Sequence, residues 1–205
     1  MQNAILSEEH VPEKIPESTG PMKQANSIPV VDFLPVELAR IDGASTLTAR
    51  FDRLLARLIT EEMVKGKSVA IKVHLGGSET YTCIHPAFMR RVVQRVQQAG
   101  GSPFLVDSGA RYNPGCGFTY DTLGCLVHPA AGLNDQYRYV HKTGLRFLPT
   151  VEVGGFIQDA DVLINLSHAK GHGHCAYGGA LKNLAMGAVT GATRRAGYGF
   201  STIVV

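Results

Sequence analysis

The sequence predicts an α/β fold, in which one domain holds a mostly parallel sheet flanked by helices. Short apolar runs rich in β-branched residues recur along the chain, and segments with apolar residues at helical spacing lie between them. This alternation implies right-handed crossovers and a parallel sheet. The composition, 44% hydrophobic and 18% charged over 205 residues, is that of a globular chain with one core.

The first 26 residues predict a disordered N-terminal tail. They contain four glutamates and three prolines and no apolar segment that could pack. The α/β domain is expected over residues 27–205. Its first element is a short strand at Ser27–Phe33.

The next elements form a helix–strand pair. Ser45 or Thr46 can cap a helix whose apolar residues run from Leu47 to Met63 and which ends at Gly66. The β-branched run Ser68–His74 predicts a buried strand.

A second pair follows the glycine-rich loop at 75–85. Pro86 suits the first position of a helix, and Gly100 and Gly101 end it. Pro103–Val106 predicts the next strand.

The second half of the chain has weaker patterns. We expect a loop at 109–117, a short helix or strand within 120–139 followed by a turn at 132–135, an edge strand at Arg146–Leu148, a short helix at Val151–Gln158, a buried strand at Val162–Leu166, a helix at Gly178–Met186 and the opening of a strand at Ser201–Val205. An apolar strand in the last five residues predicts that the domain is truncated at its C-terminal end.

Charge and hydropathy argue against several classes of partner. The net charge is +3, and lysines and arginines are spread along the chain, so we expect no nucleic acid partner. No apolar run approaches the roughly 20 residues of a membrane span, and no secretory signal is present. We therefore expect a cytoplasmic protein without a membrane partner.

The four cysteines, Cys83, Cys116, Cys125 and Cys175, are widely spaced, and none forms a C-x-x-C motif. The simplest interpretation is four free and mostly buried thiols. Cys83 and Cys116 lie in loops that leave strand ends, so either could instead be a redox or ligand thiol.

Polar residues follow three predicted strands, at the points where ligands bind in open parallel sheets. Solvated strand ends are the alternative for each, but three together favour a site. The residues are Lys72 and His74 after the first strand, Asp107 and Ser108 after the second, and Ser167, His168 and Lys170 after the third.

The segment Ser167–Gly187 carries the densest group of functional side chains, and three interpretations remain open. Glycines and lysines at the start of a helix favour anion binding, through Lys170, Gly171, Gly178, Gly179, Lys182 and Asn183. Three imidazoles and a thiolate, from His168, His172, His174 and Cys175, could bind a divalent metal such as zinc or iron. The third interpretation is a structural glycine-rich turn. Arg194 and Arg195 could contact a phosphate or carboxylate, although solvated arginines are the simpler explanation.

Four stretches resemble the domain-of-unknown-function family 362. They are VAIKVHLG at Val69–Gly76, HPAFMRRVVQRVQQAGGSPFLVDS at His85–Ser108, DADVLINLSHAKGH at Asp159–His172 and GGALKNLAMG at Gly178–Gly187. Members of this family are often fused to a ferredoxin-like domain with two 4Fe-4S clusters. The 205 residues hold no cluster motif, so such a module either lies outside this segment or is lacking.

The resemblance implies a redox-linked protein. In this hypothesis the α/β domain binds a small anionic substrate or cofactor, His168 or His172 is the general acid/base, and an iron–sulfur module or ferredoxin-like partner supplies electrons. The protein would then be an iron–sulfur-dependent oxidoreductase. The alternative is a non-catalytic electron-transfer or metal-carrier module.

Overall fold

The computed structural model of the chain describes residues 30–36, 42–76, 82–108, 117–173 and 175–201. The chain divides into two units, residues 1–33 and 34–205, and the helices and strands named below belong to the second.

The predicted tail, residues 1–26, lies outside the described residues. The predicted strand at Ser27–Phe33 is wrong for its described part, because Val30–Phe33 has no regular secondary structure. Val30, Val31 and Phe33 are more than four-fifths exposed, so their backbone groups can bond to water instead of a neighbouring strand.

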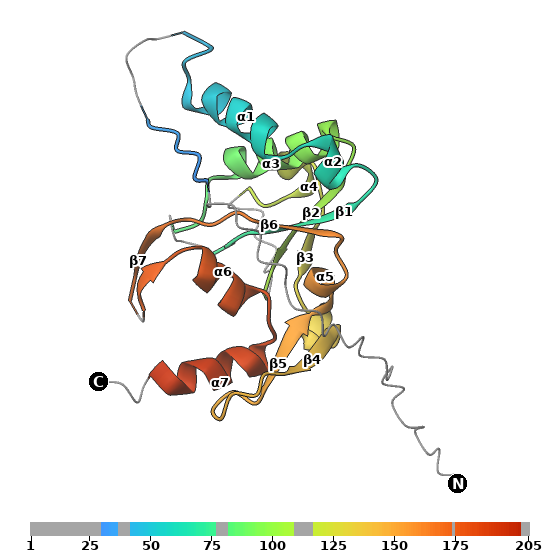
Figure 1. Ribbon diagram of the computed structural model, residues 1–205, viewed down its shortest axis with the longest axis vertical. Helices are drawn as coiled ribbons and strands as arrows, with labels where there is room; N and C mark the ends of the chain where they lie inside the picture. Colours follow the sequence, from blue (N-terminus) through green and yellow to red (C-terminus); the bar gives the residue numbers. More distant parts are fainter. Residues whose placement is uncertain (1–29, 37–41, 77–81, 109–116, 174, 202–205) are drawn as a thin grey trace. The chain divides into compact units, whose positions relative to one another are not determined.

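A four-stranded parallel sheet forms the centre of the second unit (Figure 1). Its strand order is β3-β2-β1-β6, with β1 at Ser68–Lys72, β2 at Ser102–Asp107, β3 at Val127–Pro129 and β6 at Val162–Asn165. The predicted α/β class with a parallel sheet flanked by helices is therefore confirmed. Because the strands are parallel, their carboxyl ends meet at one edge of the sheet.

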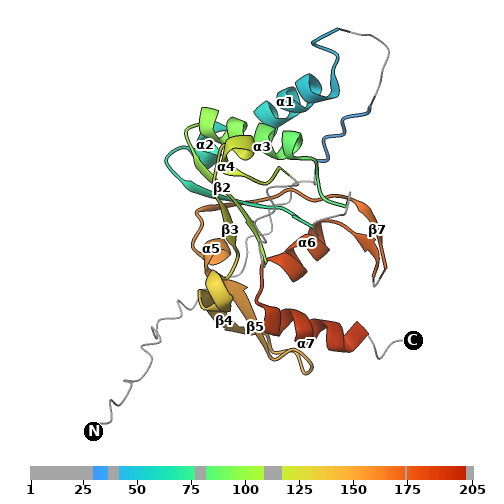
Figure 2. The ribbon, with the colours of Figure 1, turned by 180° about the vertical axis from the view of Figure 1, so that it is seen from behind.

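Four helices cover one face of this sheet (Figure 2): α1 at Leu47–Leu58, α2 at Glu61–Val64, α3 at Pro86–Gln98 and α4 at Tyr120–Leu123. Alternate strand residues point to opposite faces. On this face Val69 and Ile71 of β1 pack with Met89 and Val93 of α3, all completely buried.

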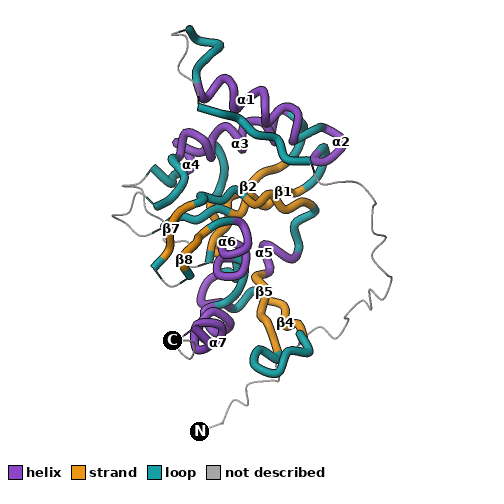
Figure 3. Tube along the Cα trace, turned by 60° about the vertical axis from the view of Figure 1, so that its left-hand side comes forward, coloured by secondary structure: helices purple, strands orange, loops and turns teal. Residues whose placement is uncertain are grey.

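The opposite face is covered by α5, at Gly155–Gln158, and α6, at Ala180–Gly187 (Figure 3). Ala70 and Val106 form a smaller cluster there, and Phe156 of α5 packs against it. Lys72 lies two residues after Ala70, so its side chain is on the face that α6 covers.

Two antiparallel hairpins and a helix complete the unit. β4, at Arg138–Lys142, pairs with β5, at Thr150–Gly154, and β7, at Lys170–His172, pairs with β8, at Ala176–Gly178. A short 3-10 turn, η2, lies at Leu133–Asp135, and the helix α7 spans Gly191–Ser201.

Several predicted elements need correction. Residues 146–148 form the loop between β4 and β5, not an edge strand, since Gly144 at φ +71° and Pro149 turn the chain on either side. Of the helix predicted at Val151–Gln158, only the part from Gly155 is helical. The residues before it form a strand, because the valines at 151 and 153 are two positions apart, which is the period of a strand. Ser201 is the last residue of α7, so the predicted strand does not begin there, and 202–205 lie outside the described residues.

The predicted helix at Leu47–Met63 is confirmed in its first part and broken after Leu58. Thr46 caps α1 by accepting a hydrogen bond from the Ala49 amide at 3.2 Å. Thr60 then takes an extended conformation and begins α2, as threonine often does at a helix start. Within the described part of the chain, no helix combines the length and hydropathy needed to cross a membrane.

Candidate functional site

A buried lysine stands at the carboxyl end of β1. The Lys72 side chain is 0% exposed, and its Nζ lies 2.9 Å from Asp107 Oδ1 at the end of β2. Nζ also donates to Asn183 Oδ1 of α6 at 2.6 Å and to the Val73 carbonyl. Burial lowers the pKa of Lys72, and the Asp107 charge opposes that shift. All three ammonium protons therefore have acceptors, which a buried charge requires.

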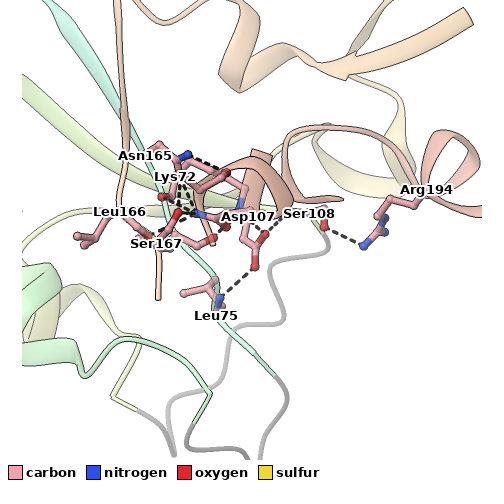
Figure 4. Close-up of polar contacts among 11 residues, drawn as sticks. Lys72, Leu75, Asp107, Ser108, Asn165, Leu166, Ser167 and Arg194 are labelled. Carbon is pink, nitrogen blue, oxygen red and sulfur yellow. Dashed lines mark hydrogen bonds and ion pairs between the residues drawn. The ribbon is translucent and has the colours of Figure 1, made fainter. Parts of the chain in front are cut away.

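The Asp107 carboxylate is fixed by backbone as well as by Lys72 (Figure 4). Its Oδ2 accepts from the Leu75 amide at 3.0 Å and its Oδ1 from the Ser108 amide at 2.8 Å. These bonds connect the loop after β1 with the loop after β2.

Asn183 joins α6 to the end of β6. Its Nδ2 donates to Asn165 Oδ1 at 2.8 Å and to Ser167 Oγ at 3.0 Å, and Ser167 Oγ donates to Asn165 Oδ1 at 2.7 Å. Lys72, Asp107, Asn165, Ser167 and Asn183 thus form one hydrogen-bonded unit, which we call the floor network.

Gly187, one turn after Asn183, explains how α6 comes so close. A Cβ atom at this position would overlap with the end of the Lys72 side chain and lie 2.6 Å from Asp107 Oδ1. The backbone of α6 therefore lies directly against the Lys72–Asp107 ion pair. Any residue larger than glycine at position 187 would displace the helix.

A pocket of about 330 Å³ lies next to the floor network at the carboxyl edge of the sheet. It brings together ten residues that the sequence singled out: His74, Asp107, Ser108, His168, Lys170, His172, Gly178, Gly179, Lys182 and Asn183. The segments after β1, β2 and β6 all contribute, as the convergence of parallel strand ends requires.

The segment after β6 carries a lysine and a histidine that bind the same carbonyl. Lys170 Nζ donates to the Thr82 carbonyl at 2.8 Å, and His168 Nδ1 lies 2.9 Å from that oxygen. A carbonyl only accepts, so Nδ1 carries the proton, and Nε2 is the acceptor nitrogen of the neutral ring. Burial lowers the pKa of Lys170, nearby Cys83 opposes that shift, and the charge of Lys182 adds to it.

His74 lines the same pocket and is half-buried. Burial lowers its pKa below the usual 6.5, and the charge of Lys170 acts in the same direction, against a smaller opposing effect of Asp107. The ring is therefore neutral at pH 7.

Arg194 of α7 is the cation for which sequence reasoning favoured a solvated role. It lines the pocket, and its Nη1 donates to Ser108 Oγ at 2.8 Å. Helix α7 is held in place because the Gly191 amide donates to Asp135 Oδ2 at 2.6 Å. No local pattern marks an arginine that reaches a strand end 86 positions away. We call Lys170, Lys182 and Arg194 the rim cations.

Other predicted site residues lie apart from the pocket. Lys72 is behind its wall and does not line it, Gly171 and Cys175 are exposed, and His174 and Cys116 lie outside the described residues. Among the residues that the structure describes, no three His, Cys, Asp or Glu side chains gather to hold a metal ion. The four-ligand metal site, which includes His174, stays a prediction.

Comparison with protein families gives a match that covers most of the chain. The family model described as "Domain of unknown function (DUF362)" matches residues 69–200, which include the whole pocket lining. Neither the curated proteins nor the solved structures contain a match to this chain.

Proposed function

The chain belongs to the domain-of-unknown-function family 362, and we propose that its pocket binds a small anionic molecule. The observation that carries the proposal is the charge of the lining. Lys170, Lys182 and Arg194 line the pocket, and Asp107 is the one acid among its lining residues. Because Asp107 is paired with buried Lys72, its charge is already balanced, and the lining residues carry more positive than negative charge.

The rim cations also suit an anion chemically. Arginine offers a planar pair of donors that matches a carboxylate or phosphate, and lysine adds a point charge. Positive charges that share a partly enclosed site attract an oppositely charged ligand and lower the free energy of its bound state. A ligand anion would relieve the mutual repulsion of these side chains.

A histidine next to the bound anion could transfer a proton. His168 and His172 both line the pocket, and imidazole exchanges protons near neutral pH. The bond from His168 Nδ1 to the Thr82 carbonyl orients that ring and leaves Nε2 to accept a proton. We assign the general acid/base role to one of these two residues.

The redox part of the proposal rests on the family resemblance. A 4Fe-4S cluster takes four cysteine thiolates, and the chain has four cysteines. Cys125 is buried in the apolar core, where burial raises its pKa to about 11, which does not suit a thiolate ligand. The residues described here therefore do not fit a cluster. In this proposal the iron–sulfur module is a separate ferredoxin-like domain or partner, and iron and sulfide analysis after anaerobic purification tests it.

Calorimetric titration with inorganic phosphate and with acetate tests anion binding directly. We expect one site per chain, and Lys170→Gln should weaken binding about ten-fold, since it removes one charge from the site. Lys65→Gln is the matched control, because Lys65 is exposed, pairs with Glu61 on α2 and does not line the pocket. Equal affinities in the two variants, or no binding by the unaltered protein, would reject the proposal.

A further inference from the structure

Two of the three rim cations, Arg194 and Lys170, are anchored at separate places. Arg194 bonds to Ser108, which follows β2, whereas Lys170 bonds to the Thr82 carbonyl beside His168, which follows β6. β2 and β6 flank β1 on opposite sides. Two strand spacings separate them, or about 10 Å.

The close-up of the floor network shows the strand ends on its two sides. Arg194 and Ser108 lie on one side of Asp107, and Asn165 and Ser167 of the β6 end lie on the other (Figure 4). Lys170 belongs to the segment that continues from the β6 end, so the strand order puts Lys170 and Arg194 toward opposite ends of the pocket.

Each end keeps hydrogen-bond donors for a ligand. Among the described residues, Arg194 uses one N–H of its guanidinium, on Ser108 Oγ. The Ser108 hydroxyl accepts that bond, so its own proton can be donated to an anion beside the guanidinium. At the other end, Lys170 uses one of its three N–H groups, on the described carbonyl of Thr82.

We propose that the ligand is a small molecule with two anionic groups, such as a dicarboxylate, one bound by Arg194 with Ser108 and the other by Lys170. This inference rests on the proposed anion-binding function and adds the substrate class to it. A single carboxylate satisfies one end and leaves the charge of the other uncompensated. A molecule with an acidic group at each end can bind at both ends of the pocket. Its second group then binds without a further loss of translational and rotational entropy.

The test is calorimetric titration of the whole chain with a series of dicarboxylates, from succinate to suberate, and with the monocarboxylate of the same carbon number in each case. We expect the best dicarboxylate to bind at least about ten-fold more tightly than its monocarboxylate, as one additional charge-assisted contact provides. Arg194→Gln and Lys170→Gln should each reduce that ratio to about one. Arg195→Gln is the matched control, since it removes the same charge from the next, exposed position of α7, and it should leave the ratio unchanged.

The outcomes separate this inference from the proposed function. Binding of monocarboxylates with no advantage for any dicarboxylate would overturn the two-ended ligand and leave anion binding intact. An advantage that falls equally in the variants at 194 and 195 would also overturn it, because general attraction to a positive surface would then explain the ratio. If no carboxylate and no phosphate binds at all, the proposed function itself fails.

Discussion

The floor network and the rim cations use the same kinds of side chain in opposite ways. Lys72 is completely buried and gives every ammonium proton to an acceptor of the protein. Lys170, on the β7 hairpin, gives one proton to a described carbonyl. The comparison teaches that burial and the number of acceptors decide whether a lysine holds the structure together or remains available for a ligand.

The largest expected effect comes from removing the floor lysine. Lys72→Met leaves the Asp107 carboxylate buried without its cation, and breaking a buried ion pair costs about 3–5 kcal/mol of unfolding free energy. Lys170→Met, at the rim, should cost less than about 1 kcal/mol. Urea denaturation of both variants measures the difference.

A double variant sharpens this result. Lys72→Met with Asp107→Leu removes both charges and should be more stable than Lys72→Met alone, because no unpaired charge remains. If Lys72→Met is as stable as Lys170→Met, the distinction between floor and rim is wrong.

The next largest effect is expected at Gly187. A methyl group there overlaps with Lys72 and Asp107, so Gly187→Ala should cost about 1–3 kcal/mol although alanine favours helices. Gly197→Ala on α7 is the control, since a Cβ there meets nothing within 4 Å and should stabilise the helix by about 0.5–1 kcal/mol. Thermal unfolding of both variants gives the signs, and two changes of the same sign would contradict the close approach of α6.

The sequence predicted the fold better than it predicted the roles within the site. The class of fold, β1, β2, β6, α3 and most of α1 follow from apolar periodicity and helix caps, because those signals are local. The hairpin of β4 and β5 and the contact of Arg194 with Ser108 depend on packing between distant segments, which local patterns do not contain. Lys72 was predicted to contact an anion, and only the structure reveals that Asn183 and Asp107 already use its protons.

A smaller effect is expected from pH. The pKa of His74 is lowered in the folded chain, so as pH falls below about 6.5 the unfolded chain takes up a proton that the folded chain resists. The free energy of unfolding should therefore decrease over that range, and His74→Gln should remove this part of the decrease. His141→Gln, at an exposed position of β4, is the control. A pH profile of stability that His74→Gln leaves unchanged would mean that the ring is not coupled to the fold.

Anion binding should depend on pH in the opposite direction. A protonated His74 adds positive charge to the pocket, so the affinity for phosphate should increase as pH falls below about 6.5 in acetate-free buffer, once phosphate ionisation is accounted for. Titrations of the unaltered protein and of His74→Gln at several pH values measure this. Identical pH dependence in the two proteins would exclude His74 from the electrostatics of the site.

The central claim is that the rim cations bind an anion while the floor network maintains the fold. Its most direct test is the thermal midpoint with increasing phosphate, against chloride at equal ionic strength, for the unaltered protein and for the triple variant Lys170→Gln, Lys182→Gln, Arg194→Gln. We expect equal midpoints in chloride and a phosphate-specific increase only in the unaltered protein, equivalent to about 2.7 kcal/mol at a hundred times the dissociation constant. An equal phosphate-specific increase in the triple variant, or a much lower midpoint of that variant in chloride, would contradict the claim.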